Sequence, residues 1–303
     1  MRCWILFGTI LLMGSPTLAQ IAPTPTPTPR PGSRQAAAGP IAADNTNFDR
    51  LRSIELMTRS DRPASHPLLD LKSGIYRRPN KNEIEVLAVS EPVRSQYAVF
   101  LKQQNTGIVK LSAESSCISD TDVLVATEKC LPFKIPGAGT AYSFRTESYR
   151  LPRLADLILF DGVFRTGGVY QLVVMVELGD VAVDDVSLAT KGMKYLVDLV
   201  PVRDSDKFME FNDATVKGFV VDDFLYRKGH PVKNNVTYAL RSIAYRGRFM
   251  RGLDGITYDE LEFDRRRDVI ATFRVVERDA AGNTTIVWKL LKDLEAPKLN
   301  IKK

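Results

Sequence analysis

Histidine is scarce in this chain, and its scarcity excludes several kinds of catalytic site. The 303 residues include two histidines, His66 and His230, and each directly precedes a proline. A residue before proline is restricted to extended backbone, so we expect both histidines in surface loops. Two isolated histidines cannot supply a three-histidine zinc site, and the zinc-protease pattern H-E-x-x-H does not occur. We therefore predict no metal site and no catalytic histidine.

Cysteine is almost as scarce, and two of the three cysteines lie beyond the first 19 residues. Cys117 and Cys130 are too far apart in the sequence for the C-x-x-C spacing of thioredoxin-like redox sites. An even pair of cysteines in an oxidising compartment indicates a structural disulfide. Closing a loop of about 14 residues in this way stabilises a fold by roughly 3 kcal/mol. We predict a Cys117–Cys130 bridge.

The glycine and serine motifs of common enzyme classes are missing as well. No G-x-S-x-G occurs, which excludes the nucleophile elbow of α/β hydrolases. The segment Gly137-Ala138-Gly139 lacks the third glycine of a dinucleotide-binding fingerprint and the lysine of a P-loop. We expect this segment to form a turn, and we predict no cofactor.

Acidic residues gather in two segments, but without the spacing of a calcium loop. These residues are Glu177, Asp180, Asp184 and Asp185 in the first segment, and Asp204, Asp206, Glu210 and Asp213 in the second. Neither segment has the glycine at position six and the glutamate at position twelve of an EF-hand. Glycosidases need two carboxyl groups about 5–9.5 Å apart, a separation that sequence does not reveal. A secreted carboxylate-based hydrolase therefore remains an alternative.

Long hydrophobic runs are absent apart from one short run near the start. Arg2 precedes an apolar stretch at 4–13, and residues 15–19 end in Thr17-Leu18-Ala19. This pattern is typical of a signal peptide cut after Ala19. The apolar stretch is shorter than the roughly 20 residues of a transmembrane helix. We predict a signal peptide at 1–19, a secreted or periplasmic protein, and no transmembrane anchor.

The next segment, 20–43, contains a proline–threonine tract at 23–32 and an alanine-rich stretch. Alternating prolines fix φ and remove backbone donors, so the tract favours an extended polyproline II linker. Residues 45–57 follow with Phe48, Leu51, Ile54 and Met57 at helical spacing. This spacing predicts one short N-terminal helix.

From residue 74 onward, short apolar runs alternate with turn residues. The expected strands are 74–78, 83–89, 97–101, 107–111, 122–126, 142–145, 157–160, 163–166, 169–176, 193–200, 217–221, 236–245, 269–277 and 284–291. Asp161-Gly162 and Gly167-Gly168 favour two-residue turns, so we expect three consecutive antiparallel strands across 157–176, the third of them buried. A hairpin loop at 279–283 joins the last two strands.

These runs predict a mainly β fold, with antiparallel sheets in a sandwich or barrel-like arrangement and few other helical turns. The polar stretch at 202–213 predicts an internal boundary. We therefore expect a disulfide-containing β-rich region at 44–205 and a second β-rich region at 206–303 packed on the first.

A basic stretch interleaved with aromatic residues is the most suggestive binding feature. Its members are Arg241, Tyr245, Arg246, Arg248, Phe249 and Arg251, and three arginines follow at 265–267. Arginines and aromatic rings together bind anionic groups and stack on flat ligands. Alternatively, the stretch is a solvated strand whose charges are neutralised by the acidic residues between 254 and 264. The first possibility makes Arg241, Tyr245, Arg246, Arg248 and Arg251 a candidate anionic-ligand site.

The net charge of +6 is mild, so a nucleic-acid partner is not expected. The sequence favours a non-enzymatic binding or structural module, with an anionic polysaccharide or a protein as partner. The alternatives are the hydrolase above and a carrier of an apolar ligand inside a β-barrel.

Overall fold

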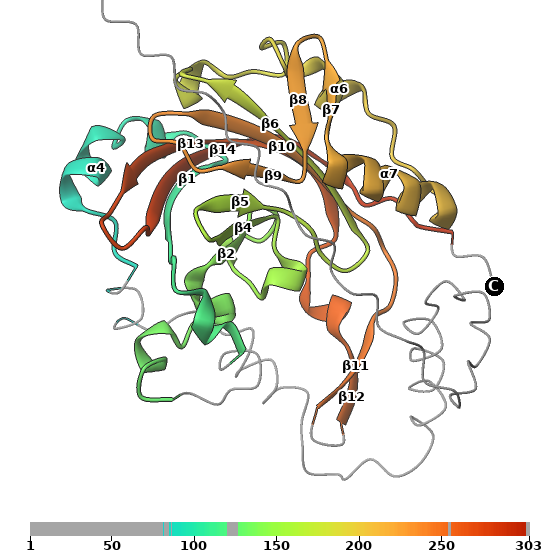
Figure 1. Ribbon diagram of the computed structural model, residues 1–303, viewed down its shortest axis with the longest axis horizontal. Coiled ribbons are helices and arrows are strands. Elements are labelled where there is room, and N and C mark those ends of the chain that lie inside the picture. The colour runs from blue at the N-terminus through green and yellow to red at the C-terminus, as the bar shows by residue number, and fades with distance from the viewer. Residues whose placement is uncertain (1–80, 82–84, 86, 120–126, 254–255, 301–303) are drawn as a thin grey trace, which may run out of the picture. The chain divides into compact units, whose positions relative to one another are not determined.

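The computed structural model describes residues 81, 85, 87–119, 127–253 and 256–300. A curved seven-stranded antiparallel sheet dominates this part of the chain (Figure 1). Its strands, in spatial order, are β1 (Thr106–Leu111), β14 (Thr284–Glu295), β13 (Arg267–Arg278), β10 (Thr237–Ala244), β6 (Gln171–Gly179), β8 (Phe224–Arg227) and β7 (Phe219–Val221). The predicted mainly β, antiparallel fold class is confirmed.

A smaller antiparallel sheet of five strands lies inside the curve of the large sheet (Figure 1). Its order is β3 (Ser148–Tyr149), β2 (Ala141–Ser143), β4 (Leu157–Phe160), β5 (Val163–Arg165) and β9 (Gly229–Pro231). A separate hairpin, β11 (Met250–Leu253) and β12 (Ile256–Asp259), extends away from both sheets.

The inner core between the two sheets is rich in aromatic side chains. Phe164 and Tyr238 pack against Phe273 with ring centroids 5.1 Å and 5.3 Å from it, and Phe144 lies 5.6 Å from Trp288. All five side chains are at least 98% buried. Burying such large apolar surfaces is the main stabilising contribution to a fold of this kind.

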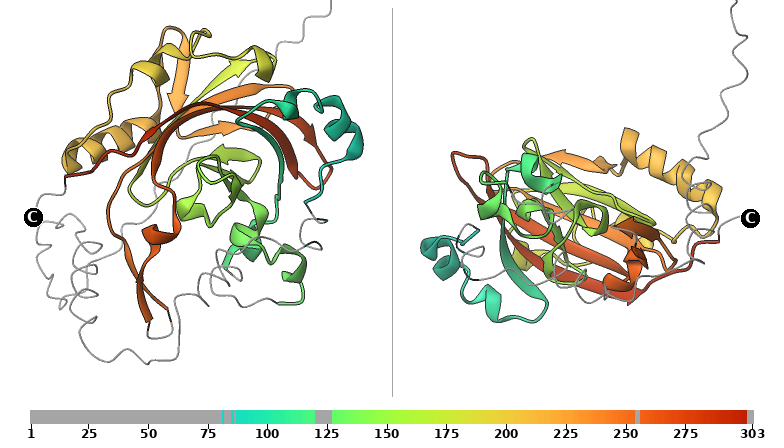
Figure 2. Two further views of the ribbon diagram at one scale, coloured as in Figure 1. Left: turned by 180° about the vertical axis from the view of Figure 1, so that it is seen from behind. Right: turned by 90° about the horizontal axis from the view of Figure 1, so that it is seen from below.

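A second, outer core covers the opposite face of the large sheet. Figure 2 shows α7 (Ser205–Lys217) on this outer side. Phe208 and Phe211 of α7 pack there against a buried cluster that includes Val174 of the sheet. The shorter helix α6 (Lys194–Asp198) contributes the fully buried Leu196 to the same cluster. The central strands β6 and β10 therefore have apolar neighbours on both faces, which is why the first six residues of β6 and all eight of β10 are buried.

The turn chemistry predicted one hairpin correctly and misplaced the strand after it. Asp161 and Gly162 have φ values of +50° and +68°, which suit the two-residue turn between β4 and β5. The third strand, β6, is buried as expected, but it does not pair with β5. It pairs with β10 and β8 in the large sheet instead, so the chain passes from one sheet to the other between residues 165 and 171.

Several expected strands are correct, and the last hairpin is among them. β13 and β14 pair along almost their whole lengths, as predicted for 269–277 and 284–291. The strands expected at 107–111, 142–145, 217–221 and 236–245 correspond to β1, β2, β7 and β10. Expectations for 45–57, 74–78 and 122–126 lie outside the described residues, as do the signal peptide and linker. Of the strand expected at 83–89, residues 83, 84 and 86 also lie outside them, and the described residues 85 and 87–89 form no strand.

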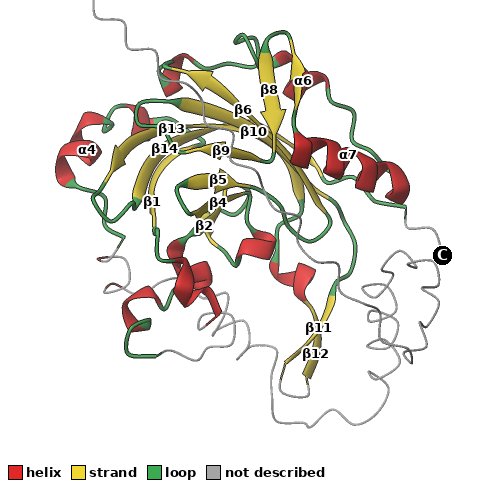
Figure 3. Cartoon of the chain, viewed as in Figure 1, coloured by secondary structure: helices red, strands yellow, loops and turns green. Residues whose placement is uncertain are grey.

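Two expected strands are helical instead (Figure 3). Residues 193–200 contain α6, and 97–101 follow α4 (Glu91–Gln96) and enter a 3₁₀ turn at Phe100–Lys102. Pro92 in the first turn of α4 favours helix initiation there. In α6, packing of Leu196 into the outer core prevails over local β-propensity.

The polar stretch expected to form a boundary is mostly helix α7. The Asp204 carboxylate accepts hydrogen bonds from the backbone N–H groups of Asp206 and Lys207, at 3.0 Å and 3.2 Å, and so caps the helix. Strands from both sides of residue 205 share the large sheet. The described residues on both sides of residue 205 lie in one compact unit.

Candidate functional site

The basic stretch divides into a buried part and an exposed part. Arg241 lies in the central strand β10 and is 3% exposed. Its guanidinium binds both carboxylate oxygens of Asp268, at 2.9 Å and 2.7 Å, and donates to the carbonyl oxygens of Leu196 and Leu199 at the end of α6. Arg241 therefore joins α6 to the sheet and is not available to an external anion.

Tyr245 is also buried, which removes a second member of the predicted set. Its ring packs against Phe208 of α7 at 5.4 Å, and burial raises the pKa of its phenol. Its backbone N–H donates to the carbonyl of Tyr170 at 2.9 Å. Tyr245 thus anchors the start of the exposed segment without reaching the surface itself.

Arg246 and Arg248 are exposed, and they follow Tyr245 directly in the chain. The backbone of Arg246 donates to the carbonyl of Pro297 at 2.9 Å, so the base of this segment is fixed to the last part of the chain. Within the described residues, no acidic side chain forms an ion pair with either arginine. Both guanidinium groups therefore remain open to an external anion.

Two aromatic rings lie beside the segment that carries these arginines. Tyr170 and Phe249 meet edge to face with centroids 6.4 Å apart, and both are partly exposed. A side chain at Gly247 would come within 3.3 Å of the Tyr170 ring, so the glycine lets the segment approach it. We call Arg246, Arg248, Tyr170 and Phe249 the arginine–aromatic surface.

Arg251, unlike Arg246 and Arg248, lies close to an acidic side chain. Its side chain is 33% exposed and lies 3.9 Å from the fully buried carboxylate of Glu260. Arg153 binds the same carboxylate through Nε at 2.8 Å to each oxygen. The acidic residues around 260 therefore neutralise Arg251 in part, as the solvated-strand alternative expects, whereas they leave Arg246 and Arg248 unpaired.

A buried network of charged side chains holds the backbone beside the arginine–aromatic surface in place. Arg266 donates to the carbonyl oxygens of Tyr170 and Tyr245, at 2.7 Å and 2.9 Å, and its third nitrogen binds Asp264 at 2.8 Å. Burial lowers the pKa of Arg266 to about 10, and the Asp264 carboxylate opposes that shift. Arg266 thus fixes the backbone that carries Tyr170 and leads into Arg246.

The same network continues into the small sheet. Arg145 binds Asp156 at 2.7 Å and Asp264 at 2.6 Å, and all three side chains are fully buried. Burial alone would lower the pKa of Arg145, but the two carboxylates raise it above its ordinary value. Asp156 also accepts hydrogen bonds from Gln171 and Ser242 of the large sheet, at 2.8 Å and 2.6 Å. The network therefore connects both sheets to the loop at 264–266.

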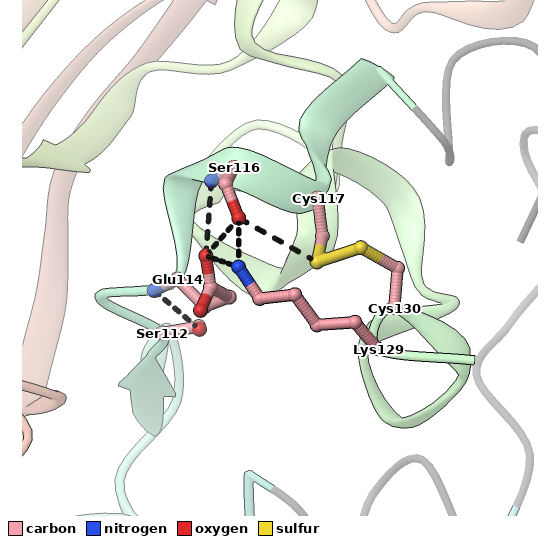
Figure 4. Close-up of a disulfide and its surroundings, with 6 residues drawn as sticks. All are labelled: Ser112, Glu114, Ser116, Cys117, Lys129 and Cys130. Atoms are coloured by element: carbon pink, nitrogen blue, oxygen red, sulfur yellow. Dashed lines mark hydrogen bonds and ion pairs between the residues drawn. A yellow bond between two sulfur atoms is a disulfide. The ribbon is translucent and has the colours of Figure 1, made fainter. Parts of the chain in front are cut away.

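The predicted Cys117–Cys130 disulfide is present, with the two Cα atoms 5.4 Å apart (Figure 4). Beside it, Lys129 Nζ donates to Ser116 Oγ at 2.7 Å, a pairing that superficially resembles a serine–lysine nucleophile. Lys129 Nζ also lies 3.6 Å from Glu114 and its side chain is 65% exposed, so the three side chains form an exposed polar cluster beside the bridge. Both sulfur-bearing residues are buried, which suits a structural bridge.

The expectation that His230 lies in a surface loop is wrong. It lies in β9, is 2% exposed, and its Nε2 is 3.2 Å from the carbonyl oxygen of Met175. Burial lowers its pKa to about 4, so the ring is neutral in the folded protein at neutral pH. His66 lies outside the described residues.

Among the residues the structure describes, no three histidine, cysteine, aspartate or glutamate side chains come close enough together to hold a metal ion. The acidic residues of the second segment flank or belong to α7, where Asp204 serves as its cap. In the described part of the chain, no helix is long and apolar enough to cross a membrane.

Sequence reasoning missed Tyr170 as part of this surface, and it noted Arg266 only as one of the three arginines at 265–267, without its supporting role. Both act through contacts with residues more than 70 positions away, and no local pattern indicates such contacts. Comparison with known proteins adds no relative, because no protein-family model, curated protein or solved structure matches the chain.

Proposed function

We propose that this protein is a binding module for an anionic polymer, with an acidic or sulfated polysaccharide as the favoured ligand class. The observation that carries the proposal is the arginine–aromatic surface. Its two exposed arginines have no ion-pair partners among the described residues, and they share one short segment with Phe249, whose partly exposed ring meets that of Tyr170. A guanidinium donates two parallel hydrogen bonds to a carboxylate or sulfate. A flat ring offers an apolar face to the C–H groups of a sugar.

The hydrogen bonds from Arg266 favour the interpretation that this segment binds a ligand over the interpretation that it is only a solvated part of the surface. Ligand groups bind more tightly to side chains whose backbone is already fixed, because less conformational entropy is lost on binding. Arg266, Tyr245 and Pro297 hold the backbone at both sides of this surface. Backbone hydrogen bonds therefore fix both sides of the segment that carries Arg246 and Arg248.

The location of the protein forms part of the proposal. The signal-peptide pattern at 1–19 and the Cys117–Cys130 disulfide both suit a secreted or periplasmic protein. Acidic polysaccharides are ligands that such a protein would meet outside the cytoplasm.

The two alternative functions have less support. A carrier of an apolar ligand needs an empty interior, whereas aromatic side chains pack the space between the sheets. A carboxylate-based hydrolase needs two carboxyl groups that face one substrate. Of the acidic residues considered for it, Glu177 pairs with Lys233, Asp180 pairs with Arg274, and Asp204 caps α7.

Heparin chromatography of matched variants tests the proposal. The double variant Arg246→Gln/Arg248→Gln removes both exposed guanidinium groups, and Lys102→Gln/Lys207→Gln removes two exposed charges elsewhere. We expect the arginine variant to elute at clearly lower salt than the lysine variant and the parent protein. Equal elution of the two variants would mean that retention reflects net charge alone, and would contradict the proposal.

A further inference from the structure

Two segments of the chain match the acceptor pattern of N-linked glycans, which is an asparagine followed by any residue except proline and then by serine or threonine. They are Asn-Val-Thr at 235–237 and Asn-Thr-Thr at 283–285. A glycan is bulky and hydrophilic, so a folded protein accommodates it only on an asparagine whose side chain faces solvent. The surroundings of the two asparagines differ in this respect.

Asn235 occupies the turn between β9 and β10 and is exposed. Its φ of +58° is in the left-handed region, which asparagine adopts more readily than most other residues. The turn is held through its backbone, because the N–H of Asn235 donates to the carbonyl oxygen of Val275 at 3.0 Å. Among the described residues, none forms a hydrogen bond with the side-chain amide of Asn235. A glycan on this amide therefore breaks no contact of the fold.

Asn283, by contrast, uses both polar atoms of its side-chain amide inside the fold and is partly buried. Its Oδ1 accepts a hydrogen bond from the backbone N–H of Ala113 at 2.8 Å, and its Nδ2 donates to Asp279 at 2.9 Å. The Asp279 carboxylate also binds Lys110 of β1 at 3.0 Å. These contacts fix the loop between β13 and β14 beside the end of β1. A sugar ring on Nδ2 would have to displace some of them.

We propose that Asn235 carries an N-linked glycan and that Asn283 stays unmodified in the folded protein. The proposal rests on the secretion proposed above, since the glycan is transferred in the secretory pathway. The amide nitrogen of Asn235 attacks C1 of an oligosaccharide held on a lipid diphosphate. The new N–C1 bond replaces the C1–O bond to the diphosphate, the nitrogen loses one proton, and the lipid diphosphate leaves.

The position of Thr237 determines when the transfer takes place. Thr237 is fully buried in β10, and its hydroxyl donates to the carbonyl oxygen of Val181. The transferase recognises this hydroxyl together with the asparagine, so transfer must precede the pairing of β10 with its neighbours β6 and β13. The fold then selects among the modified chains, because it accommodates a glycan on Asn235 and opposes one on Asn283.

Site-resolved mass spectrometry tests the proposal on the full chain, produced in a eukaryotic secretory host. Peptide N-glycosidase in water labelled with heavy oxygen converts each glycan-bearing asparagine into labelled aspartate, so the two sites are measured separately. We expect the label at Asn235 in most molecules of the secreted protein and little label at Asn283. A chain that has lost residues 1–19 but carries no glycan on Asn235 would overturn the proposal, as would equal occupancy of the two sites. A chain that keeps residues 1–19 would overturn the secretion on which the proposal rests.

Two adjacent exposed asparagines provide matched variants. Asn235→Asp removes the acceptor, and aspartate tolerates the left-handed backbone of this turn. Asn234→Asp makes the same change in charge at the neighbouring exposed residue, which does not begin an acceptor pattern. We expect glycosidase treatment to increase the electrophoretic mobility of the parent protein and of Asn234→Asp, and to leave that of Asn235→Asp unchanged. A mobility change in Asn235→Asp would mean that Asn283 carries a glycan, which contradicts the proposal.

Discussion

Arg145→Met is the substitution that most severely tests the buried charge network. The guanidinium of Arg145 binds Asp156 and Asp264 and donates to the carbonyl oxygens of Leu154 and Arg265, at 2.8 Å and 2.9 Å. Methionine keeps an unbranched side chain but provides no charge and no donor. The substitution leaves Asp156, which is fully buried, without its cation.

The expected loss follows from the burial of these groups. Removing one partner of a buried ion pair costs about 3–5 kcal/mol, because the remaining charge is left uncompensated. Asp264 keeps Arg266 as a partner, so most of the loss falls on Asp156. With an m value of about 2–3 kcal/mol per molar urea, the unfolding midpoint should fall by about 1–2.5 M.

Urea unfolding followed by tryptophan fluorescence measures this change, since Trp288 lies in the inner core. Arg265→Met is the matched control, because that side chain is 60% exposed and pairs with Asp293 at the surface. The control should lose no more than about 1 kcal/mol. The double variant Arg145→Met/Asp156→Asn should recover part of the loss. If Arg145→Met cost no more than the control, the reasoning would be refuted.

Three further predictions concern His230, the disulfide and the leader. The pKa of His230 is lowered to about 4 from about 6.5, so its contribution to stability is present above pH 6.5 and is lost as the pH falls to 4. Over this range the free energy of unfolding should fall by up to about 3 kcal/mol more in the parent protein than in His230→Gln, and parallel pH profiles would disprove this. Cys117→Ala/Cys130→Ala should lower the free energy of unfolding by about 3 kcal/mol, as measured by urea titration. The prediction is wrong if reductant destabilises the parent protein by less than about 1 kcal/mol. N-terminal sequencing of the exported protein should begin at Gln20, and retention of residues 1–19 would argue against the signal peptide.

Local turn chemistry explains which parts of the fold were predictable. Asp161-Gly162 marked the β4–β5 hairpin, and the loop at 279–283 marked the β13–β14 hairpin, because the turn residues themselves impose those geometries. The same reasoning failed for β6, whose partners β10 and β8 are distant in sequence. No local signal chooses between a neighbouring strand and a distant one.

The candidate site was predictable only as a stretch of residues. Alternation suggested that Arg241 is solvated on one face of a strand, but α6 covers that face and accepts its hydrogen bonds. Helix α7 has two recognisable sequence signals, the N-cap residue Asp204 and the C-terminal glycine Gly218. Its polar composition led to the prediction of a boundary instead of a helix. The position of Tyr170 beside Phe249 depends on sheet pairing and on Arg266, neither of which has a local signature.

Arginine footprinting of the unmodified protein tests the proposed function most directly. Phenylglyoxal modifies exposed arginines, and mass spectrometry reports the rate at each one with and without a heparin oligosaccharide. The account predicts that the oligosaccharide slows modification of Arg246 and Arg248 several-fold, while Arg94, which is also exposed, reacts at an unchanged rate. Unchanged rates at Arg246 and Arg248 under conditions where the oligosaccharide binds would contradict it.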